Sequence, residues 1–299
     1  MNFLAKNLRG TGVAVVTPFN EDFSIDTESI ISLVDFLIDN GVDYIVVHGT
    51  TGESSTLNKS EKNLSRTAFV NANKGRVPMI LGLGSNDTLS IVNDLRSSQF
   101  SGFSAILSVT PFYNKPSQNG LYKHYSAISK ASPLPIILYN VPSRTGVNML
   151  AKTTIEIASN HSNIIGIKEA CGDLNQVKQL IEKRPKDFMI ISGDDETAVK
   201  TVLLGGDGVI SVAAGCIPKY FTEIIRLALN KNEDLSQKKL NQIQLLLKLL
   251  FAEGNPSGIK SALSSMNLCK NVLRLPLTKV GKDLDLNIKK TITSIYKQQ

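Results

Sequence analysis

The chain repeats one unit eight times, a short run of apolar and β-branched residues followed by a longer segment with the residue spacing of an amphipathic helix. Each run is apolar throughout and does not alternate with polar residues, which is typical of parallel strands that are buried on both faces. The predicted strands cover residues 11–17, 43–48, 78–82, 104–109, 135–139, 163–168, 188–192 and 207–212.

The segments between these runs predict helices. In residues 27–40 apolar side chains recur at helical spacing, Thr27 is the predicted N-cap, and Gly41 is the predicted stop. The other predicted helices cover residues 59–74, 87–99, 117–131, 149–159, 173–183, 194–204 and 218–230.

Eight strand–helix units in succession predict an α/β protein with the TIM (β/α)8 barrel fold, because eight parallel strands with helical crossovers close on themselves. An open, doubly wound sheet is the alternative. Such a sheet usually carries a glycine-rich phosphate-binding loop after its first strand, and this chain has TPFNED there instead.

After about residue 230 the pattern changes to helices without intervening strands, predicted at residues 233–253, 256–266 and 283–297. We therefore expect two parts, a barrel over residues 1–230 and a C-terminal helical region over residues 231–299. The second part would be an appendage that packs on the barrel or on a neighbouring subunit.

Charge and cysteine content exclude several classes of partner. The 33 Lys and Arg against 26 Asp and Glu give a net charge of +7, but the basic residues are scattered, so we expect no nucleic-acid partner. A basic surface would still attract small carboxylate substrates. The three cysteines lie far apart and without metal-ligand spacing, which indicates reduced thiols in a cytoplasmic protein. The first ten residues do not read as a signal peptide, and no apolar run approaches the roughly 18 residues that cross a membrane.

In a barrel of this kind the active site lies at the carboxyl ends of the strands, and the sixth predicted strand ends in Lys168. Desolvation disfavours the ammonium form of a lysine at such a position, and the neutral amine that results can attack a ketone to form a Schiff base. The alternative is a structural lysine that extends to solvent or pairs with a carboxylate such as Glu169.

The fifth predicted strand ends in Tyr139, and the loop after it contains Arg144. A phenol beside a Schiff-base lysine can carry protons, although a tyrosine at this position can also be a core aromatic residue. The guanidinium of Arg144 can bind a substrate carboxylate through two hydrogen bonds, or it can anchor the loop.

Two further strand ends carry polar groups. In HGTTGESSTL, residues 48–57, Thr50 and Thr51 offer hydroxyl and backbone N–H groups suited to a small carboxylate, or the cap of a helix. Tyr113 lies in the loop TPFYNKPSQNGLY, residues 110–122, where packing alone would explain it. His48, His124 and His161 do not cluster with other ligand types, so no metal is expected.

Five segments together resemble the dihydrodipicolinate synthase family, also called 4-hydroxy-tetrahydrodipicolinate synthase. The similarity extends from about residue 8 to residue 280. The segments are GTTGES at 49–54, TPFYNKPSQNGLY at 110–122, YNVPSRTG at 139–146, GIKEA at 166–170 and SGDD at 192–195. The resemblance implies a lyase that condenses pyruvate with L-aspartate 4-semialdehyde through a lysine Schiff base, in the first committed step of diaminopimelate and lysine synthesis. It also implies a homotetramer, a dimer of tight dimers, without a metal or an organic cofactor.

The resemblance assigns a role to each site residue. Lys168 forms the imine, Tyr139 and Thr50 form a proton relay, and Tyr113 completes that relay from the neighbouring subunit. Thr51 and the backbone near Ile210 hold the pyruvate carboxylate. The remaining assignments are Arg144 as the ligand of the semialdehyde carboxylate and Gly193 as part of the second-substrate pocket.

Other members of the superfamily share the barrel and the lysine. N-acetylneuraminate lyase and the 2-keto-3-deoxy-sugar-acid aldolases are the enzyme alternatives, and a catalytically silent regulatory or scaffold barrel is the non-enzyme alternative. Arg144 and Thr51 favour the synthase. The scaffold would require the loss of the lysine or the tyrosine, and both are present.

The sequence departs from one pattern within this family. Members that are strongly inhibited by lysine carry a histidine after TLN, a glutamate four residues after the asparagine of the loop that follows the third strand, and a tyrosine before the relay tyrosine. Here these positions hold Lys59, Ser90 and Phe112, while Asn86 remains and Lys62 stands where a second histidine is common. We therefore expect weak feedback inhibition by lysine or none.

Overall fold

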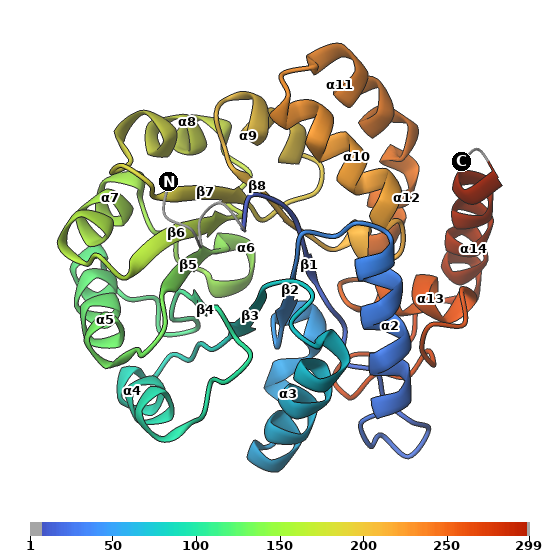
Figure 1. The fold of residues 1–299 in the computed structure, drawn as a ribbon, viewed down its shortest axis with the longest axis horizontal. Helices are drawn as coiled ribbons and strands as arrows, with labels where there is room; N and C mark the ends of the chain where they lie inside the picture. The colour runs from blue at the N-terminus through green and yellow to red at the C-terminus, as the bar shows by residue number, and fades with distance from the viewer. Residues whose placement is uncertain (1–7, 298–299) are drawn as a thin grey trace.

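A computed structural model describes residues 8–297 of the chain. Its eight strands form a closed barrel in which all neighbours run parallel and β1 pairs with both β2 and β8 (Figure 1). The predicted TIM barrel is therefore confirmed. The strands are β1 (Gly10–Ala14), β2 (Tyr44–Val47), β3 (Met79–Gly82), β4 (Ala105–Val109), β5 (Ile136–Asn140), β6 (Ile164–Glu169), β7 (Met189–Ser192) and β8 (Gly208–Ser211).

Two layers of apolar side chains surround the strands. An inner cluster, which includes Tyr44, Ile137 and Ile210, fills the barrel. A larger outer cluster joins the other face of each strand to the helices. Gly12 makes room for the interior, since a Cβ atom there would lie 2.1 Å from the ring of Tyr44. The predicted burial of both strand faces is thus confirmed.

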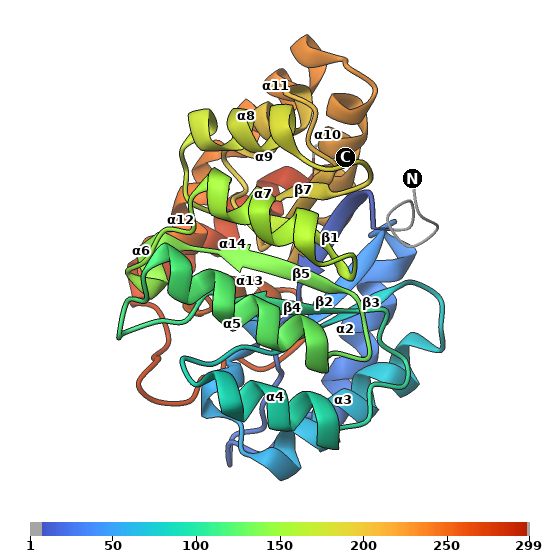
Figure 2. The same ribbon diagram turned by 90° about the vertical axis from the view of Figure 1, so that its left-hand side faces the viewer.

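Helices cover the outside of the barrel in chain order. Figure 2 shows α4, α5, α7 and α8 one after another along one flank. They are α2 (Thr27–Asp39), α3 (Lys59–Asn73), α4 (Thr88–Ser97), α5 (Gln118–Ala131), α7 (Ala151–Asn160), α8 (Leu174–Lys183), α9 (Ala198–Leu203) and α10 (Pro218–Leu229). Short turns at η1 (Thr50–Gly52), η2 (Ser54–Thr56), α6 (Pro142–Thr145) and η3 (Ala213–Gly215) follow the strand ends and were not predicted.

One predicted helix cap is wrong. The side chain of Asp26, and not that of Thr27, accepts the hydrogen bond from the Ser29 N–H that caps α2. Asp and Thr are both favourable N-cap residues, so the sequence alone does not show which of the two neighbours caps the helix.

The last part of the chain forms α11 (Glu233–Gln242), α12 (Gln244–Phe251), α13 (Ser257–Ser265) and α14 (Lys282–Lys297). The single helix predicted over residues 233–253 is wrong, because the chain leaves helical geometry at Ile243, with φ −106° and ψ 3°. The side chain of Ile243 is fully buried in the outer cluster, so packing and not a glycine or proline turns the chain there. The division of the chain at residue 230 stays a prediction.

Between residues 8 and 297, no helix is both long and apolar enough to cross a bilayer. The prediction about the first ten residues rests mainly on residues 1–7, which lie outside the described part of the chain.

Candidate active site

Lys168 lies near the carboxyl end of β6, and its side chain is turned to the inside of the barrel. The residue is only 6% exposed, and Nζ lies 4.5 Å from the centroid of the Tyr139 ring. Tyr139 is the register partner of Lys168 on β5, so two rigid strands set the distance between the amine and the ring. The structure thus brings the predicted lysine and tyrosine together.

Glu169 points to the opposite face of β6 and does not pair with Lys168. Its carboxylate accepts hydrogen bonds from Asn140 Nδ2 and Gln176 Nε2, each at 2.9 Å, and from the Cys171 N–H at 2.9 Å. Burial raises the pKa of the Glu169 carboxyl, and the hydrogen bonds from Asn140 and Gln176 oppose that rise. The alternative in which Glu169 neutralises Lys168 is therefore wrong.

Gly193 follows β7 and leaves space for the lysine side chain. A Cβ atom at this position would lie 3.1 Å from Lys168 Cε and 2.6 Å from the Cβ of Ala170. A larger residue would therefore clash with Ala170 and press against the lysine side chain. A cavity of about 190 Å³ opens here, a size suited to a small organic acid.

Six of the eight predicted site residues line this cavity: Thr50, Thr51, Tyr139, Arg144, Lys168 and Gly193. Ile210 does not line it, since its side chain belongs to the inner cluster and is 1% exposed. The prediction concerned the backbone near Ile210, and Val212, two residues further on, does reach the cavity.

The two threonines occupy the 3-10 turn η1 after β2. This turn has no side-chain cap, and the helix that follows it, α3, is capped by Asn58, so Thr50 and Thr51 do not serve as the cap. Thr51 is buried, and its Oγ1 accepts a hydrogen bond of 3.0 Å from Asn255 Nδ2.

Asn255 itself lines the cavity, and the sequence analysis missed it. It lies between α12 and α13, 204 residues from Thr51, and no motif near it signals a site. Its Oδ1 atom is buried without a hydrogen-bond partner, so a hydrogen-bond donor, such as a hydroxyl or amino group of a bound ligand, would satisfy it.

Asp195 adds a titratable group to the cavity wall. One oxygen of its carboxylate accepts hydrogen bonds from the N–H groups of Val212, at 3.1 Å, and Ala213, at 2.9 Å. Burial raises the pKa of Asp195 to about 6 in spite of these bonds. Asp195 therefore ties the end of β7 to the turn after β8.

Tyr113 does not join this group within one chain. Its side chain is 88% exposed, and its backbone has a φ of 73°, a value that non-glycine residues rarely adopt. The adjacent Phe112 is also exposed, at 39%. Two neighbouring aromatic residues are thus presented to solvent beside the site.

A second, larger cavity of about 550 Å³ adjoins the first. The two share Thr50, Tyr139 and Arg144 in their linings, so Arg144 stands where they meet. Besides Arg144, the lining of the larger cavity carries the cations Lys62 and Arg66 and the carboxylates of Asp94 and Glu53, of which Glu53 is paired with Lys260. A carboxylate that entered by this route would meet positive charge before reaching Lys168.

The histidines have structural partners. His48 Nε2 lies 2.5 Å from Ser65 Oγ, His124 Nδ1 lies 2.8 Å from Thr88 Oγ1, and His161 contacts a serine hydroxyl. Burial lowers the pKa of His48 to about 3 and that of His124 to about 4. Over the described residues, no group of three or more His, Cys, Asp or Glu side chains is arranged to hold a metal ion.

The comparison with known proteins agrees with the barrel fold. The model of the dihydrodipicolinate synthetase family matches residues 7–295. The chain belongs to this family. A family member from Flavobacterium psychrophilum, 4-hydroxy-tetrahydrodipicolinate synthase, is 49% identical over 279 residues, which cover 92% of this chain and 94% of that protein.

Solved structures of the family superpose closely on this barrel. Dihydrodipicolinate synthase from Thermotoga maritima has a TM-score of 0.93 at 38% identity, covering 96% of this chain and 98% of its own. A monomeric dihydrodipicolinate synthase variant has a TM-score of 0.93 at 37% identity and covers 97% of each chain. The resemblance read from the sequence is therefore confirmed.

Proposed function

We propose that this chain is a 4-hydroxy-tetrahydrodipicolinate synthase, a lyase that condenses pyruvate with L-aspartate 4-semialdehyde in the biosynthesis of diaminopimelate and lysine. The observation that carries the proposal is the buried amine of Lys168 beside the ring of Tyr139, in a small cavity at the carboxyl ends of the strands. Family membership supplies the reaction, and the shared position of these side chains around one cavity supports the role that we propose for each.

The first step forms the covalent adduct. The neutral amine of Lys168 attacks the ketone carbon of pyruvate, water leaves, and a C=N bond replaces the C=O bond. The protonated imine withdraws electrons, so the adjacent methyl group loses a proton and becomes an enamine. The enamine carbon attacks the aldehyde carbon of the second substrate, and a new C–C bond forms. The amino group of the semialdehyde then displaces the lysine and closes the ring.

Protons must enter and leave a cavity that holds little solvent. We assign this transfer to the hydroxyl of Tyr139, and the packing of the Tyr139 ring against the lysine amine supports the assignment. We assign Thr50 the next position in the relay, since it lines both cavities. Tyr113 would complete the relay from a second copy of the chain.

Carboxylate binding divides between the two cavities. Thr51 and the backbone beyond Ile210 lie on the wall near Lys168 and would hold the pyruvate carboxylate. Arg144, exposed where the cavities meet, would bind the carboxylate of the semialdehyde. Gly193 keeps open the space in which the second substrate must approach the enamine.

The exposed position of Tyr113 supports an oligomer. An aromatic pair at Phe112 and Tyr113 left in water beside an active site has the character of an interface, where aromatic side chains bury their rings against a partner. We propose a homotetramer built as a dimer of tight dimers, with Tyr113 entering the partner's cavity. The three free cysteines suit a reducing, cytoplasmic location.

A substrate comparison tests the proposal. The purified protein is incubated with pyruvate and aspartate semialdehyde, and in parallel with N-acetylneuraminate and with 2-keto-3-deoxygluconate, with Lys168→Arg as the control. We expect turnover with the first pair of substrates and none with the sugar acids. Faster cleavage of either sugar acid would identify a sibling aldolase instead.

A further inference from the structure

The residue that ends the threonine turn is unusual in both conformation and burial. Glu53 follows Gly52 with a φ of 49°, in the left-handed region that non-glycine residues rarely enter, and it is 2% exposed. Its N–H donates to the Thr50 carbonyl at 3.1 Å and so closes η1. A buried carboxylate and a disfavoured backbone persist only where their surroundings fix both.

The residues that hold Glu53 in place lie more than 200 positions later in the chain. Lys260 Nζ, on α13, donates to Glu53 Oε1 at 2.5 Å, and both side chains are 0% exposed. The backbone N–H of Arg274 donates to Glu53 Oε2 at 3.0 Å. Both carboxylate oxygens are therefore held by the segment 260–274.

The ammonium group of Lys260 makes two further contacts. Its Nζ donates to the Val272 carbonyl at 2.7 Å and lies 4.2 Å from the centroid of the Phe19 ring. Burial lowers the pKa of Lys260, and the charge of Glu53 acts in the opposite direction. The pair is a buried salt bridge with hydrogen bonds beyond the pair itself, the geometry in which removal of one partner is costly.

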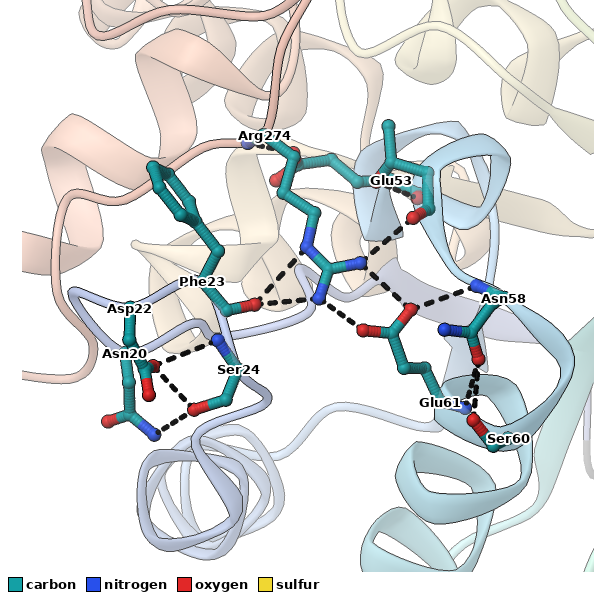
Figure 3. A network of polar contacts seen from close by, with 10 residues as sticks. Asn20, Asp22, Phe23, Ser24, Glu53, Asn58, Ser60, Glu61 and Arg274 are labelled. Carbon is teal, nitrogen blue, oxygen red and sulfur yellow. Dashed lines mark hydrogen bonds and ion pairs between the residues drawn. The ribbon is translucent and has the colours of Figure 1, made fainter.

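The side chain of Arg274 extends the connection along the loop (Figure 3). It donates to the Thr56 carbonyl at 2.8 Å, to the Phe23 carbonyl at 2.6 Å and to both oxygens of Glu61. Glu61 lies in the first turn of α3 and also accepts from the Asn58 N–H. The whole segment from Glu53 to Glu61 is thus attached to Arg274.

A further bond reaches the substrate side of the turn. Asn255, just before α13, donates to Thr51 Oγ1, and Thr17 Oγ1 donates to the Gly52 carbonyl at 2.7 Å from the opposite side. The turn that carries Thr50 and Thr51 is therefore held by the loop after β1 and by the segment 255–274.

We propose that Glu53 is a positioning residue, which the segment 255–274 uses to hold Thr50 and Thr51 in their places at the site. This inference rests on the roles proposed above for the two threonines. We call Glu53 together with Asn255, Lys260 and Arg274 the clamp. It gives the chain beyond the barrel a part in the chemistry, although of these four residues only Glu53 and Asn255 line the cavities.

The physical reason is the short path from Glu53 to the reacting groups. Glu53 is three positions after Thr50 in the sequence, and the N–H that closes the turn belongs to Glu53 itself. A displacement of about 1 Å in a positioning group can cost a rate on the order of 10²-fold. Loss of the clamp is therefore expected to raise the KM for pyruvate, through Thr51, and to lower kcat, through Thr50.

Three variants and one control test the clamp. Glu53→Gln keeps the shape of the side chain and removes its charge, and Lys260→Met removes the partner. The double variant, with both substitutions, leaves no uncompensated buried charge and provides a folded protein if the single variants are unstable. The control is Asp207→Asn, which breaks the ion pair with Arg184 at 2.5 Å, before β8 at the other end of the barrel.

Two readouts are taken at a temperature at which circular dichroism shows each protein folded. The first is hydrogen exchange of the peptide covering residues 49–57, and the second is the pair of kinetic constants for pyruvate. We expect exchange at least tenfold faster in the double variant than in the control, with a KM for pyruvate raised about tenfold and a lower kcat.

The outcomes separate the clamp from the roles of the threonines. Unchanged exchange over residues 49–57 would overturn the clamp. Faster exchange with unchanged kinetic constants would keep the clamp as a mechanical feature, overturn its part in catalysis and reject the proposed roles of Thr50 and Thr51. An equal kinetic loss in Asp207→Asn would show a general effect of stability, which also overturns the inference.

Discussion

Lys168 Nζ lies 4.5 Å from the centroid of the Tyr139 ring, and the two residues are register partners on β6 and β5. A cation over an aromatic face at this distance is stabilised by the ring, so the contact suits the charged adduct as well as the free ammonium. Because both residues belong to strands of a closed barrel, the contact does not depend on a mobile loop. The proposed chemistry therefore begins from a preorganised pair.

Loss of the hydroxyl of Tyr113 is expected to slow turnover without affecting the fold. One positioned proton-transfer group contributes about 10²–10⁴-fold, so Tyr113→Phe should lower kcat by at least 10²-fold while pyruvate still forms its imine. Tyr122→Phe is the matched control, because its ring packs on His161 and lines neither cavity. Stopped-flow absorbance and steady-state assays check both steps, and a wild-type rate in Tyr113→Phe would remove Tyr113 from the relay.

The proposed role of Tyr113 also predicts that specific activity depends on the protein concentration. If Tyr113 serves the site of a partner, specific activity falls as the protein is diluted below its dimer dissociation constant. Analytical ultracentrifugation at matching concentrations supplies the fraction of oligomer. Full activity in a monomeric sample would contradict the arrangement.

Arg144→Ala should affect the semialdehyde far more than pyruvate. Loss of a charge-assisted contact to a carboxylate costs about 2 kcal/mol, which is roughly a thirtyfold fall in kcat/KM for that substrate. Arg144→Lys keeps the positive charge but cannot bind a carboxylate through two parallel hydrogen bonds, so its kcat/KM should lie between those of the wild type and Arg144→Ala. The control Arg96→Ala, on the exposed face of α4, should leave kcat/KM unchanged. A change confined to the pyruvate constants would assign Arg144 to the other carboxylate.

The strand ends explain why so much of this site was predictable. Lys168, Tyr139 and the threonine turn each follow a run of buried apolar residues, and a parallel barrel collects all such ends on one face. Once the barrel fold was predicted, the place of each residue at the end of a strand therefore predicted that these residues lie together on one face of the barrel. The motifs of the family then gave each residue a role.

The contacts of the C-terminal segment were not predictable for a physical reason. Asn255, Lys260 and Arg274 bind residues more than 200 positions earlier in the chain, and no local pattern encodes such pairs. Lys260 stands in a helix where a lysine normally indicates an exposed face, yet it is completely buried. The break at Ile243 was missed likewise, because it depends on packing and not on a turn residue.

Buried histidines should make the protein sensitive to acid. The folded pKa of His124, about 4, lies below the ordinary value of 6.5, so the unfolded chain binds more protons between these values. Stability contributed by neutral His124 is present above pH 6.5 and is lost as the pH falls toward 4. Between pH 7.5 and pH 4.5 this group should lower the free energy of unfolding by roughly 2 to 3 kcal/mol.

Denaturant titrations at the two pH values check that expectation. His124→Asn keeps a hydrogen-bonding group near Thr88 and should reduce the loss of stability on acidification by about that amount. His161→Asn is the control, because His161 is more exposed and should change the pH dependence less. An identical acid dependence in wild type and His124→Asn would show that His124 is not the group responsible.

Lysine should inhibit this enzyme weakly or not at all. Lys62, Ser90 and Phe112 line the larger cavity, and Arg66 adds a second cation there. A lysine ligand would bring its own ammonium group close to Lys62 and Arg66 and would find a serine where a glutamate could have paired with it. The one carboxylate of this cavity that is not held by Lys260, that of Asp94, interacts with Arg66. Initial rates at saturating pyruvate and constant ionic strength, with lysine raised to tens of millimolar, check this. Half-inhibition below about 1 mM, a binding free energy of some 4 kcal/mol or more, would contradict the prediction.

The central claim is that Lys168 is the covalent nucleophile. Pyruvate and borohydride are added to the protein, and peptide mass spectrometry locates the reduced adduct. The account predicts one modified lysine, Lys168, in the wild type and no adduct in Lys168→Ala, while Lys260→Met still becomes labelled at Lys168. An adduct on another lysine, or equal labelling of Lys168→Ala, would contradict it.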